Sequence, residues 1–295
     1  MHNFIEQRLE VIREHNAIVS VLAVHKPSLY SAVTDGFDCL LLVVTRQDGQ
    51  AQRHHVHYIK DNFRIQERWI TPEALEEQIV HGVERSFIYW VLKGEILLDR
   101  ETFLEGLRHR MLEFPEEIRD QKLLIEFSRF LRCYMRSKDY LSEEHLLDAY
   151  HDILEALHHW ARIAIIEAGF HPEVTVWSQV KQINHGIYKL YEELTLSKET
   201  LKQRVELVLL ACEFSVMSKM AACCKPLLQQ LGSRSEAWSL EELQQCPQLT
   251  DVRNELPLLL NKLVKKTLAK EVIAAADPEL SSLELRYQDV KQAVV

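Results

Sequence analysis

The hydrophobic pattern of this chain changes its period near Pro115, and that change constrains the fold more than any other feature. Before it, short apolar and β-branched runs alternate with turn residues, which is typical of strands. After it, apolar residues recur at helical spacing as far as Leu231. The sequence therefore predicts an α+β fold, with a mixed or antiparallel sheet of about five strands in the first third of the chain and a helical bundle in the residues that follow.

Three domains are expected from this pattern. Residues 1–115 would form the sheet domain, residues 116–231 the helical bundle, and residues 232–295 a small helical or winged-helix-like module. The boundary before the last module is placed at "LGSRSE", the one polar, small-residue stretch that is typical of a linker. Beyond it, "WSLEELQQ" and "ELPLLLNKLVKKTLAKEVIA" predict a short and a longer helix, and "SLELRYQ" predicts a strand.

The stretch "FDCLLLVVTR" predicts a central strand that is covered on both faces, because it is almost uniformly apolar. A lone carboxylate, Asp38, stands at its start, where an aspartate is also common as an ordinary turn residue. The strand is followed by "QDGQ", a predicted hairpin turn, then by "HHVHYIKD" and "FRIQERWI", two strands joined by a tight "DN" turn.

Two resemblances follow from these motifs. "PSLYSAVTDGFDCLLLVV" resembles the phosphate loop and strand of the polymerase-β-type nucleotidyltransferases. Nearly the whole chain resembles the YgxA-type nucleotidyltransferase-like proteins of Gram-positive bacteria, through "GEILLDRETF", "DAYHDILEALHHWARIAIIEAGFHPEVTVWSQV" and "YKLYEEL". The resemblance implies a nucleotidyltransferase-like domain, a helical substrate-binding-like domain and a C-terminal helix-turn-helix-like domain, without implying a reaction.

The resemblance also indicates where catalytic acids would stand. Active members of the fold carry two acids at i and i+2 on this strand and a third on a neighbouring strand, which together hold two Mg²⁺ ions. Here Asp38 takes the first position and Leu40 the second. The third falls on Gln66, which is neutral, or on Glu67, which would point to the opposite face. We therefore predict a degenerate site, in which Asp38 holds Mg²⁺ weakly and the metal is possible but not required.

The expected ligand is a nucleotide or another small anion, held in a cleft between sheet and bundle. Ser28 matches the loop serine of the enzymes, although Pro27 replaces their glycine. Arg129 and Arg132 stand on one stripe of a predicted helix and could hold phosphate, or could be solvated and paired with acids. The predicted ligand-binding residues are Ser28, Asp35, Asp38, Arg129 and Arg132.

Charge argues against bulk attraction to nucleic acid, because the net charge is −9 and no segment is a basic block. The last module holds eight Lys and Arg against ten Asp and Glu. A lysine row on its longer helix could still contact DNA or a protein partner. The residues of this row are Lys262, Lys265, Lys266 and Lys270.

The remaining composition points to the cytoplasm and away from a membrane. The six cysteines include no CxxC pair, and the apolar runs are shorter than the roughly 20 residues of a membrane helix. Histidines such as His57 and His159 lack the spacing and the partners of a metal site, so we interpret them as polar packing or surface residues.

Three functions remain open at this point. The first is a nucleotidyltransferase-fold protein that binds a nucleotide or small anion without efficient transfer. The second is a regulatory or interaction protein that binds DNA or a protein through residues 232–295. The third is an active nucleotidyltransferase that acts on an unknown hydroxyl, which would need metal ligands that the sequence does not plainly supply.

Overall fold

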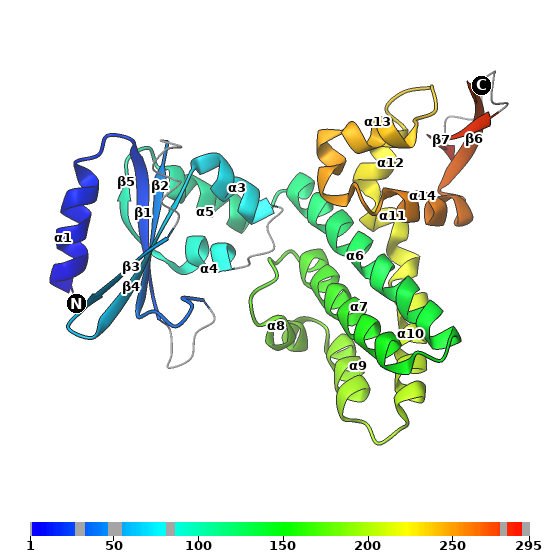
Figure 1. The fold of residues 1–295 in the computed structure, drawn as a ribbon, viewed down its shortest axis with the longest axis horizontal. Helices are drawn as coiled ribbons and strands as arrows, with labels where there is room; N and C mark the ends of the chain where they lie inside the picture. The colour runs from blue at the N-terminus through cyan, green and yellow to red at the C-terminus, as the bar shows by residue number, and fades with distance from the viewer. Residues whose placement is uncertain (1, 27–32, 47–54, 81–85, 278–281, 291–295) are drawn as a thin grey trace. The chain divides into compact units, whose positions relative to one another are not determined.

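The computed structural model describes residues 2–26, 33–46, 55–80, 86–277 and 282–290. It divides into two compact units, Met1–Pro115 with His171–Thr175, and Glu116–Phe170 with Val176–Val295 (Figure 1). The short segment at His171 joins the first unit because its ring Nε2 is 2.9 Å from the carbonyl oxygen of Met111. The expected domain boundaries at residues 115 and 231 stay predictions.

The first unit is built on a five-stranded mixed sheet with the order β3-β4-β2-β1-β5. Its strands are β1 (Ile18–His25), β2 (Cys39–Thr45), β3 (His55–Lys60), β4 (Phe63–Ile70) and β5 (Glu95–Asp99). The central strand β2 pairs antiparallel with β1 and parallel with β4. Every residue of β2 is buried, so the predicted central strand with two covered faces is confirmed.

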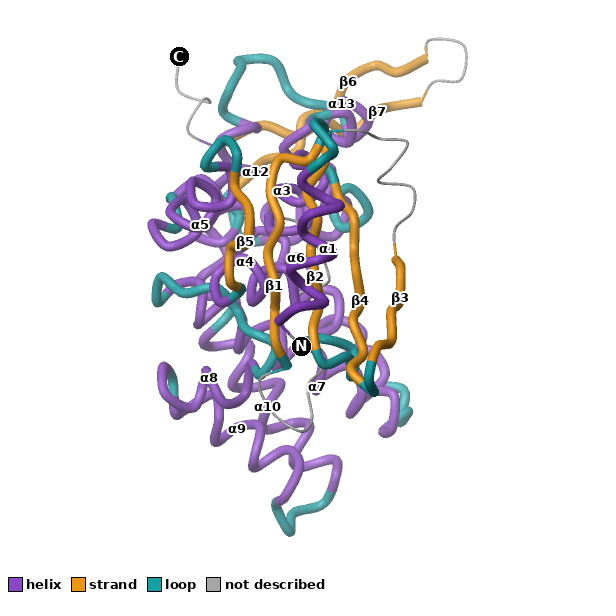
Figure 2. Tube along the Cα trace, turned by 90° about the vertical axis from the view of Figure 1, so that its left-hand side faces the viewer, coloured by secondary structure: helices purple, strands orange, loops and turns teal. Residues whose placement is uncertain are grey.

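Helices cover both faces of this sheet. One face packs against α1 (His2–Arg13), which crosses in front of the strands in Figure 2. The other packs against α3 (Pro72–Val80), α4 (Ser86–Lys93) and α5 (Phe103–Glu113). Because side chains alternate along a strand, Leu41 and Val43 face α1, whereas Leu40 and Leu42 face α3 to α5. Asp38 lies two residues before Leu40, so it is on the same face as Leu40 and Leu42.

The connections between the strands are partly as expected. Asp61 and Asn62 both have positive φ, 51° and 63°, which confirms the tight turn between β3 and β4. The turn predicted at "QDGQ" lies outside the described residues. A hairpin there would pair β2 directly with β3. That pairing is wrong, because β4 lies between β2 and β3 and pairs with both.

The second unit begins with a helical stretch, and none of its described residues before Leu231 lies in a strand. The longest helices, α6 (Glu116–Ser142) and α7 (Leu146–Glu167), pack side by side (Figure 1). Gly169, followed by Pro172, predicts the end of this helix, and its φ of 85° confirms that prediction. The other helices are α8 (Val176–Ile183), α9 (His185–Leu196), α10 (Leu201–Ser215), the 3₁₀ turn η1 (Met217–Lys219), α11 (Met220–Cys223) and α12 (Lys225–Leu231).

Two helix boundaries in this unit correct the sequence prediction. The apolar spacing of "VTVWSQVKQINHGIYKLYEEL" predicts one helix. The structure breaks it at Asn184, whose side chain accepts the N–H of Ile187 at 3.3 Å and starts α9. Ser197, a residue type that favours helix N-caps, is the cap that the sequence predicts for α10, and it does not cap it. That role belongs to Thr200, whose Oγ1 accepts the N–H of Gln203 at 3.3 Å in a capping box.

The chain ends in a small module of helices followed by a β-hairpin, which is winged-helix-like in its element order. Its elements are α13 (Leu240–Gln245), the 3₁₀ helix η2 (Pro247–Val252), α14 (Leu256–Lys265), β6 (Ala269–Asp277) and β7 (Ser282–Asp289). The predicted helix is wrong beyond Lys265, because Thr267 adopts a left-handed φ of 57° that ends it. The chain then continues as strand β6.

Candidate anion-binding site at the start of the central strand

Asp38 joins the ends of three strands through its backbone and its side chain. Its N–H donates to the carbonyl of Arg64 at 2.9 Å, and its own carbonyl accepts the N–H of Lys26 at 3.0 Å. Its carboxylate Oδ2 accepts the N–H of Arg64 at 2.8 Å. The carboxylate therefore satisfies a backbone donor where β2 and β4 begin to pair, whatever else it binds.

The two other acid positions of the enzyme pattern meet directly beside it, and neither is charged. Leu40 of β2 pairs in register with Gln66 of β4, so their side chains share the Asp38 face. Leu40 is fully buried, and Gln66 is 4% exposed. The Gln66 Oε1 is buried without a hydrogen-bond partner among the described residues. Within the same residues, no group of three or more His, Cys, Asp or Glu is placed to hold a metal ion.

Glu67 lies on the opposite face of the sheet, as predicted, and binds groups of the protein itself. Its fully buried carboxylate accepts hydrogen bonds from Arg8 Nε at 2.7 Å and Arg8 Nη2 at 2.8 Å, and from Trp69 Nε1 at 2.7 Å. The hydrogen bond with Glu67 raises the pKa of Arg8. This bidentate pair fastens α1 to the sheet, and Glu67 is not a metal ligand for the Asp38 face.

Two arginines provide the positive charge on the Asp38 face. Arg64 and Arg68 alternate with Gln66 along β4, so all three share that face. The Arg64 guanidinium lies 5.4 Å from the ring centre of Phe37. The Arg68 guanidinium lies 5.0 Å from the ring centre of Trp90, and its Nη2 is 3.3 Å from Asp35 Oδ2. Guanidinium groups held over aromatic rings, beside the carboxylates of Asp35 and Asp38, form an arrangement that can accept a phosphate or carboxylate group once the exposed Asp35 gives way.

The aromatic partners were missed by sequence reasoning. Trp90 belongs to α4, far along the chain, and its Nε1 donates to the carbonyl of Val33 at 2.7 Å. This bond holds the turn before β2 against the helix. Asp35, in that turn, has a positive φ of 49° and is exposed. Ser28 lies outside the described residues.

The predicted arginine stripe lies on α6, in the second unit. Arg132 donates to the carbonyl of Asn254 at 3.0 Å and pairs with Glu255 at 2.7 Å. Arg129 is partly buried on the same helix. Arg132 thus makes contacts with the C-terminal module, and the binding of a ligand by Arg129 and Arg132 stays a prediction.

The lysine row of the last module is not continuous. Lys265 and Lys266 are exposed at the end of α14, whereas Lys270 lies on β6 rather than on the helix. Lys262 is half-buried, and burial lowers its pKa, followed by repulsion from Lys265. Nucleic-acid contact by these lysines stays a prediction, carried by fewer exposed charges than the sequence indicated.

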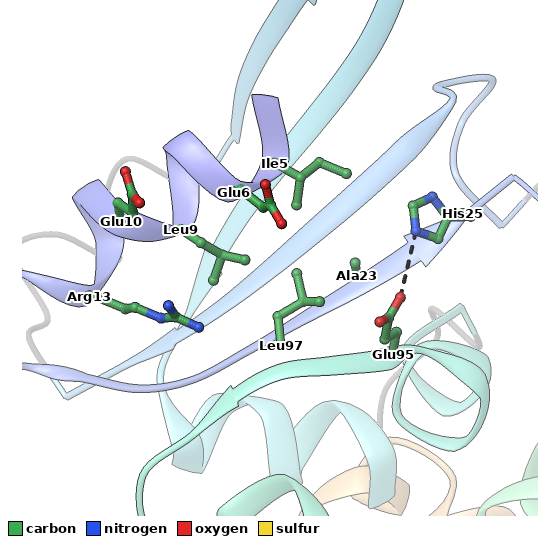
Figure 3. A pocket seen from close by; sticks show the side chains of 9 residues that line it. All are labelled: Ile5, Glu6, Leu9, Glu10, Arg13, Ala23, His25, Glu95 and Leu97. Atoms are coloured by element: carbon green, nitrogen blue, oxygen red, sulfur yellow. Dashed lines mark ion pairs between the residues drawn. The ribbon is translucent and has the colours of Figure 1, made fainter. Parts of the chain in front are cut away.

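A pocket of about 470 Å³ lies on the α1 face, away from Asp38 (Figure 3). It is lined by Ile5, Glu6, Leu9, Glu10, Arg13, Ala23, His25, Glu95 and Leu97. The His25 Nε2 is 3.9 Å from a carboxylate oxygen of Glu95. Its three carboxylates outnumber its two bases, so its charge does not favour an anionic ligand.

Comparisons with known proteins agree with this architecture. Residues 1–119 match the family described as nucleotidyltransferase-like, and residues 120–219 match the YgxA-like substrate binding domain. The chain is 33% identical over 268 residues to protein YgxA of Bacillus subtilis (strain 168), covering 91% of this chain and 90% of YgxA. It also superposes on the crystal structure of a nucleotidyltransferase-like protein from Exiguobacterium sibiricum 255-15, with a TM-score of 0.82 and 30% identity over 97% of this chain and 98% of that one.

Proposed function

The chain belongs to the family of YgxA-like, nucleotidyltransferase-like proteins, and we propose that it binds a nucleotide or another small anion without efficient nucleotidyl transfer. The observation that carries this proposal is the paired position of Leu40 and Gln66 beside Asp38. Two-metal transfer needs several carboxylates around the ions. Of the three acid positions of the enzyme pattern, only Asp38 carries a carboxylate on this face, and its Oδ2 already accepts a backbone N–H. The nearby carboxylate of Asp35 is bound to Arg68.

Cationic side chains take over the role of the metals in this proposal. Arg64 and Arg68 share the face of Asp38, and Arg68 is already bound to a carboxylate, that of Asp35. A phosphate group that displaced the exposed Asp35 would meet the same guanidinium with more charge. The buried, unpartnered Oε1 of Gln66 adds a polar atom on the same face that a ligand hydroxyl or amino group could satisfy.

Calorimetric titration of ATP tests the proposal. The wild type, Asp38→Ala and Arg68→Met are each titrated with Mg²⁺ and with a chelator, and Arg100→Met serves as the matched control. Arg100 is an arginine of the same unit whose guanidinium is bound to the backbone carbonyl groups of Arg13, His15 and Ile18. We expect ATP affinity to depend little on Mg²⁺ and to fall about tenfold or more in Arg68→Met, because one charge-assisted contact is lost.

Strong Mg²⁺-dependent binding that disappears in Asp38→Ala would contradict the degenerate site. So would transfer of a nucleotidyl group by the wild type to any hydroxyl acceptor, which would establish the active-enzyme alternative. The absence of ATP binding in both metal conditions would remove the nucleotide and leave another small anion as the ligand to be found.

A second proposal is contact with DNA or a protein through residues 232–295. It is supported by the exposed Lys265 and Lys266 at the end of α14, next to the β6–β7 hairpin. A gel-shift series with the full chain at rising salt checks it, with Lys265→Ala/Lys266→Ala as the variant. DNA affinity that is absent, or that does not change with salt or with the variant, would rule out the DNA form of this proposal.

The cytoplasm is the compartment in which we place this function, because all six cysteines are free thiols. No single helix in the described ranges is long and apolar enough to cross a membrane. One bent helix pair, Leu201–Cys223 with Lys225–Leu231, meets that criterion by length and composition.

A further inference from the structure

The pocket on the α1 face is a groove between α1 and β5, the edge strand of the sheet, and it is called the α1–β5 groove below. Arg13 stands at one end of it, and His25 and Glu95 stand together at the other (Figure 3). The groove follows α1 from Ile5 to Arg13, which corresponds to about 12 Å along a helix axis. Its volume of about 470 Å³ is within the range of pockets that bind small molecules.

A β-bulge in β5 places apolar side chains on the floor of this groove. Leu98 pairs with Val21 and Ile96 pairs with Leu22, so Leu97 is an extra residue without a partner on β1. The bulge turns both Leu97 and Leu98 to the α1 face, whereas Ile96 packs against α3 to α5. Bulges re-aim side chains in this way and are frequent next to active sites.

The rest of the floor is apolar as well. Leu97 is joined there by Ile5 and Leu9 of α1 and by Ala23 of β1. Ala23 is 1% exposed, and its short side chain leaves room above the strand. The floor therefore suits an apolar side chain of a ligand, which loses contact with water when it lies there.

One end of the groove presents a cation. The Arg13 guanidinium is exposed and makes no hydrogen bond or ion pair with any residue of the described ranges. Glu10 also lines the groove, but its side chain points away from the floor (Figure 3). A guanidinium can bind a carboxylate through two parallel hydrogen bonds, so this end suits a carboxylate of the ligand.

The opposite end presents a carboxylate. Glu95 pairs in register with Ala23, so the two side chains share the α1 face. A Glu95 oxygen lies 3.9 Å from His25 Nε2, which is too far for a hydrogen bond, and the Glu95 side chain is 66% exposed. Its carboxylate can therefore accept hydrogen bonds from an ammonium group in the groove. Glu6 also lines the groove, but it already interacts with another group of the protein, and no ligand contact is assigned to it.

We propose that the α1–β5 groove binds a short apolar peptide with free termini, whose carboxylate contacts Arg13 and whose ammonium group contacts Glu95. Opposite charges at the two ends of an apolar groove are complementary to a zwitterion that lies along it. An extended chain advances about 3.3 Å per residue, so a peptide of about three residues matches the groove, whereas the charged groups of a single amino acid are too close together to reach both ends. The groove lies on the face of the sheet opposite to Asp38, so this proposal does not rest on nucleotide binding.

NMR of the full chain with ¹³C-labelled leucine methyl groups tests this site at pH 7. The peptide Ala-Leu-Ala is titrated with free termini, as its N-acetylated form and as its C-terminal amide. The resonances of Leu9 and Leu97 are assigned with Leu9→Ile and Leu97→Ile. We expect both resonances to shift in a saturable manner with the free peptide. Each blocked form should bind about three- to fivefold more weakly, because the charged contact that it loses is partly exposed to water.

Two variants show which terminus each end of the groove binds. Arg13→Met should weaken binding of the free peptide about three- to fivefold and leave binding of the amide unchanged, because the amide does not use the guanidinium charge. Glu95→Gln should likewise weaken binding of the free peptide and leave binding of the acetylated form unchanged. Both side chains are exposed, so neither substitution threatens the fold.

Matched controls come from an ion pair between α5 and α3, on the other face of the same sheet. Arg110→Met and Glu76→Gln each remove one charge of this pair and should leave all three peptide affinities unchanged. The proposal is overturned if the free peptide does not shift the resonances of Leu9 and Leu97, or if either blocked form binds as tightly as the free peptide. It is also overturned if Arg13→Met weakens the amide as much as the free peptide, because Arg13 would then not bind the carboxylate.

Discussion

The Asp38 face of the sheet differs in its buried polar groups from the α6–α7 cluster, which is formed by Lys122, Glu126, His159 and Arg162. On the sheet, the positions beside Asp38 hold Leu40 and Gln66, so burial is achieved by removing charge. In the cluster, Lys122, Glu126 and Arg162 are all largely buried, Glu126 binds Arg162, and its charge attracts Lys122. The chain thus keeps buried charge between α6 and α7, and on the α1 face of the sheet in the Arg8–Glu67 pair, but not at the positions where the fold would bind metals.

Leu40→Asp, which adds charge to the Asp38 face, should lower the stability of the folded chain more than any other substitution considered below. The change deletes a fully buried leucine and places a carboxylate in the apolar cluster formed by β1, β2 and α3 to α5. We expect the free energy of unfolding to fall by about 5 kcal/mol or more, measured by urea denaturation. Leu40→Met is the volume-matched control and should cost about 1 kcal/mol. A folded Leu40→Asp variant that gains tight Mg²⁺ binding would show that the second acid position is still usable.

Glu126→Ala should produce the next largest loss. It removes the carboxylate that His159 and Arg162 contact and leaves buried positive charge without its partner. We expect the free energy of unfolding to fall by about 3–4 kcal/mol. The exposed Glu117 of the same helix is the matched site, and Glu117→Ala should cost less than about 1 kcal/mol. Equal losses at the two sites would mean that the cluster contributes little to the stability of the folded chain.

The sheet was predictable from sequence to the extent that its signals are local. The apolar run of β2, the positive-φ turn at Asp61 and Asn62, and the alternation that separates Gln66 from Glu67 all follow from neighbouring residues. The insertion of β4 between β2 and β3 was not predictable in this way, because it is a pairing of strands that a hairpin signal cannot encode.

The residues of the candidate sites were also predictable only where their signal is local in the sequence. Asp38 was found from its place at the start of a strand, but its bond to Arg64 depends on the parallel pairing with β4. The partners of Glu126 come from another helix, and their sequence separations of 33 and 36 residues carry no periodic signal. The helix end after Lys265 was missed for a local reason, since "KLVKKTLAKEVIA" suits either a helix or a strand until a left-handed residue ends the helix.

Lys122→Met should give a pH-dependent effect of intermediate size. The unfolded chain holds the lysine proton up to its usual pKa of 10.5, whereas the folded chain releases it near pH 8. The unfolded state therefore binds more protons in this interval, and the wild type gains stability relative to the variant as pH rises from 8 to 10.5. We expect the free energy of unfolding of the wild type, relative to that of Lys122→Met, to rise by on the order of 2 kcal/mol between pH 8 and pH 10.5. Urea denaturation of both proteins at several pH values in this range measures it.

Comparing the two proteins removes an opposing effect that they share. Burial raises the pKa of the Cys39 and Cys223 thiols to about 12, so these thiols lower stability as pH rises above 9 in both. A difference between wild type and Lys122→Met that does not change with pH would mean that Lys122 titrates as an exposed lysine, and the cluster would then hold less buried charge than its geometry indicates.

Substitution of Asp38 should change the stability least, yet it distinguishes best between a structural and a ligand-binding role for this carboxylate. If the carboxylate is present mainly as an acceptor for the Arg64 N–H, then Asp38→Ala should cost about 1 kcal/mol, whereas Asp38→Asn keeps an acceptor oxygen and should cost about half as much. Urea denaturation at neutral pH measures both. A residue kept for a ligand is instead often unfavourable for the folded protein alone, because its charge is desolvated or repelled without the ligand. An Asp38→Ala variant at least as stable as the wild type would therefore identify Asp38 as a ligand-binding group. The carboxylate at this position would then serve ligand binding and not the pairing of β2 with β4.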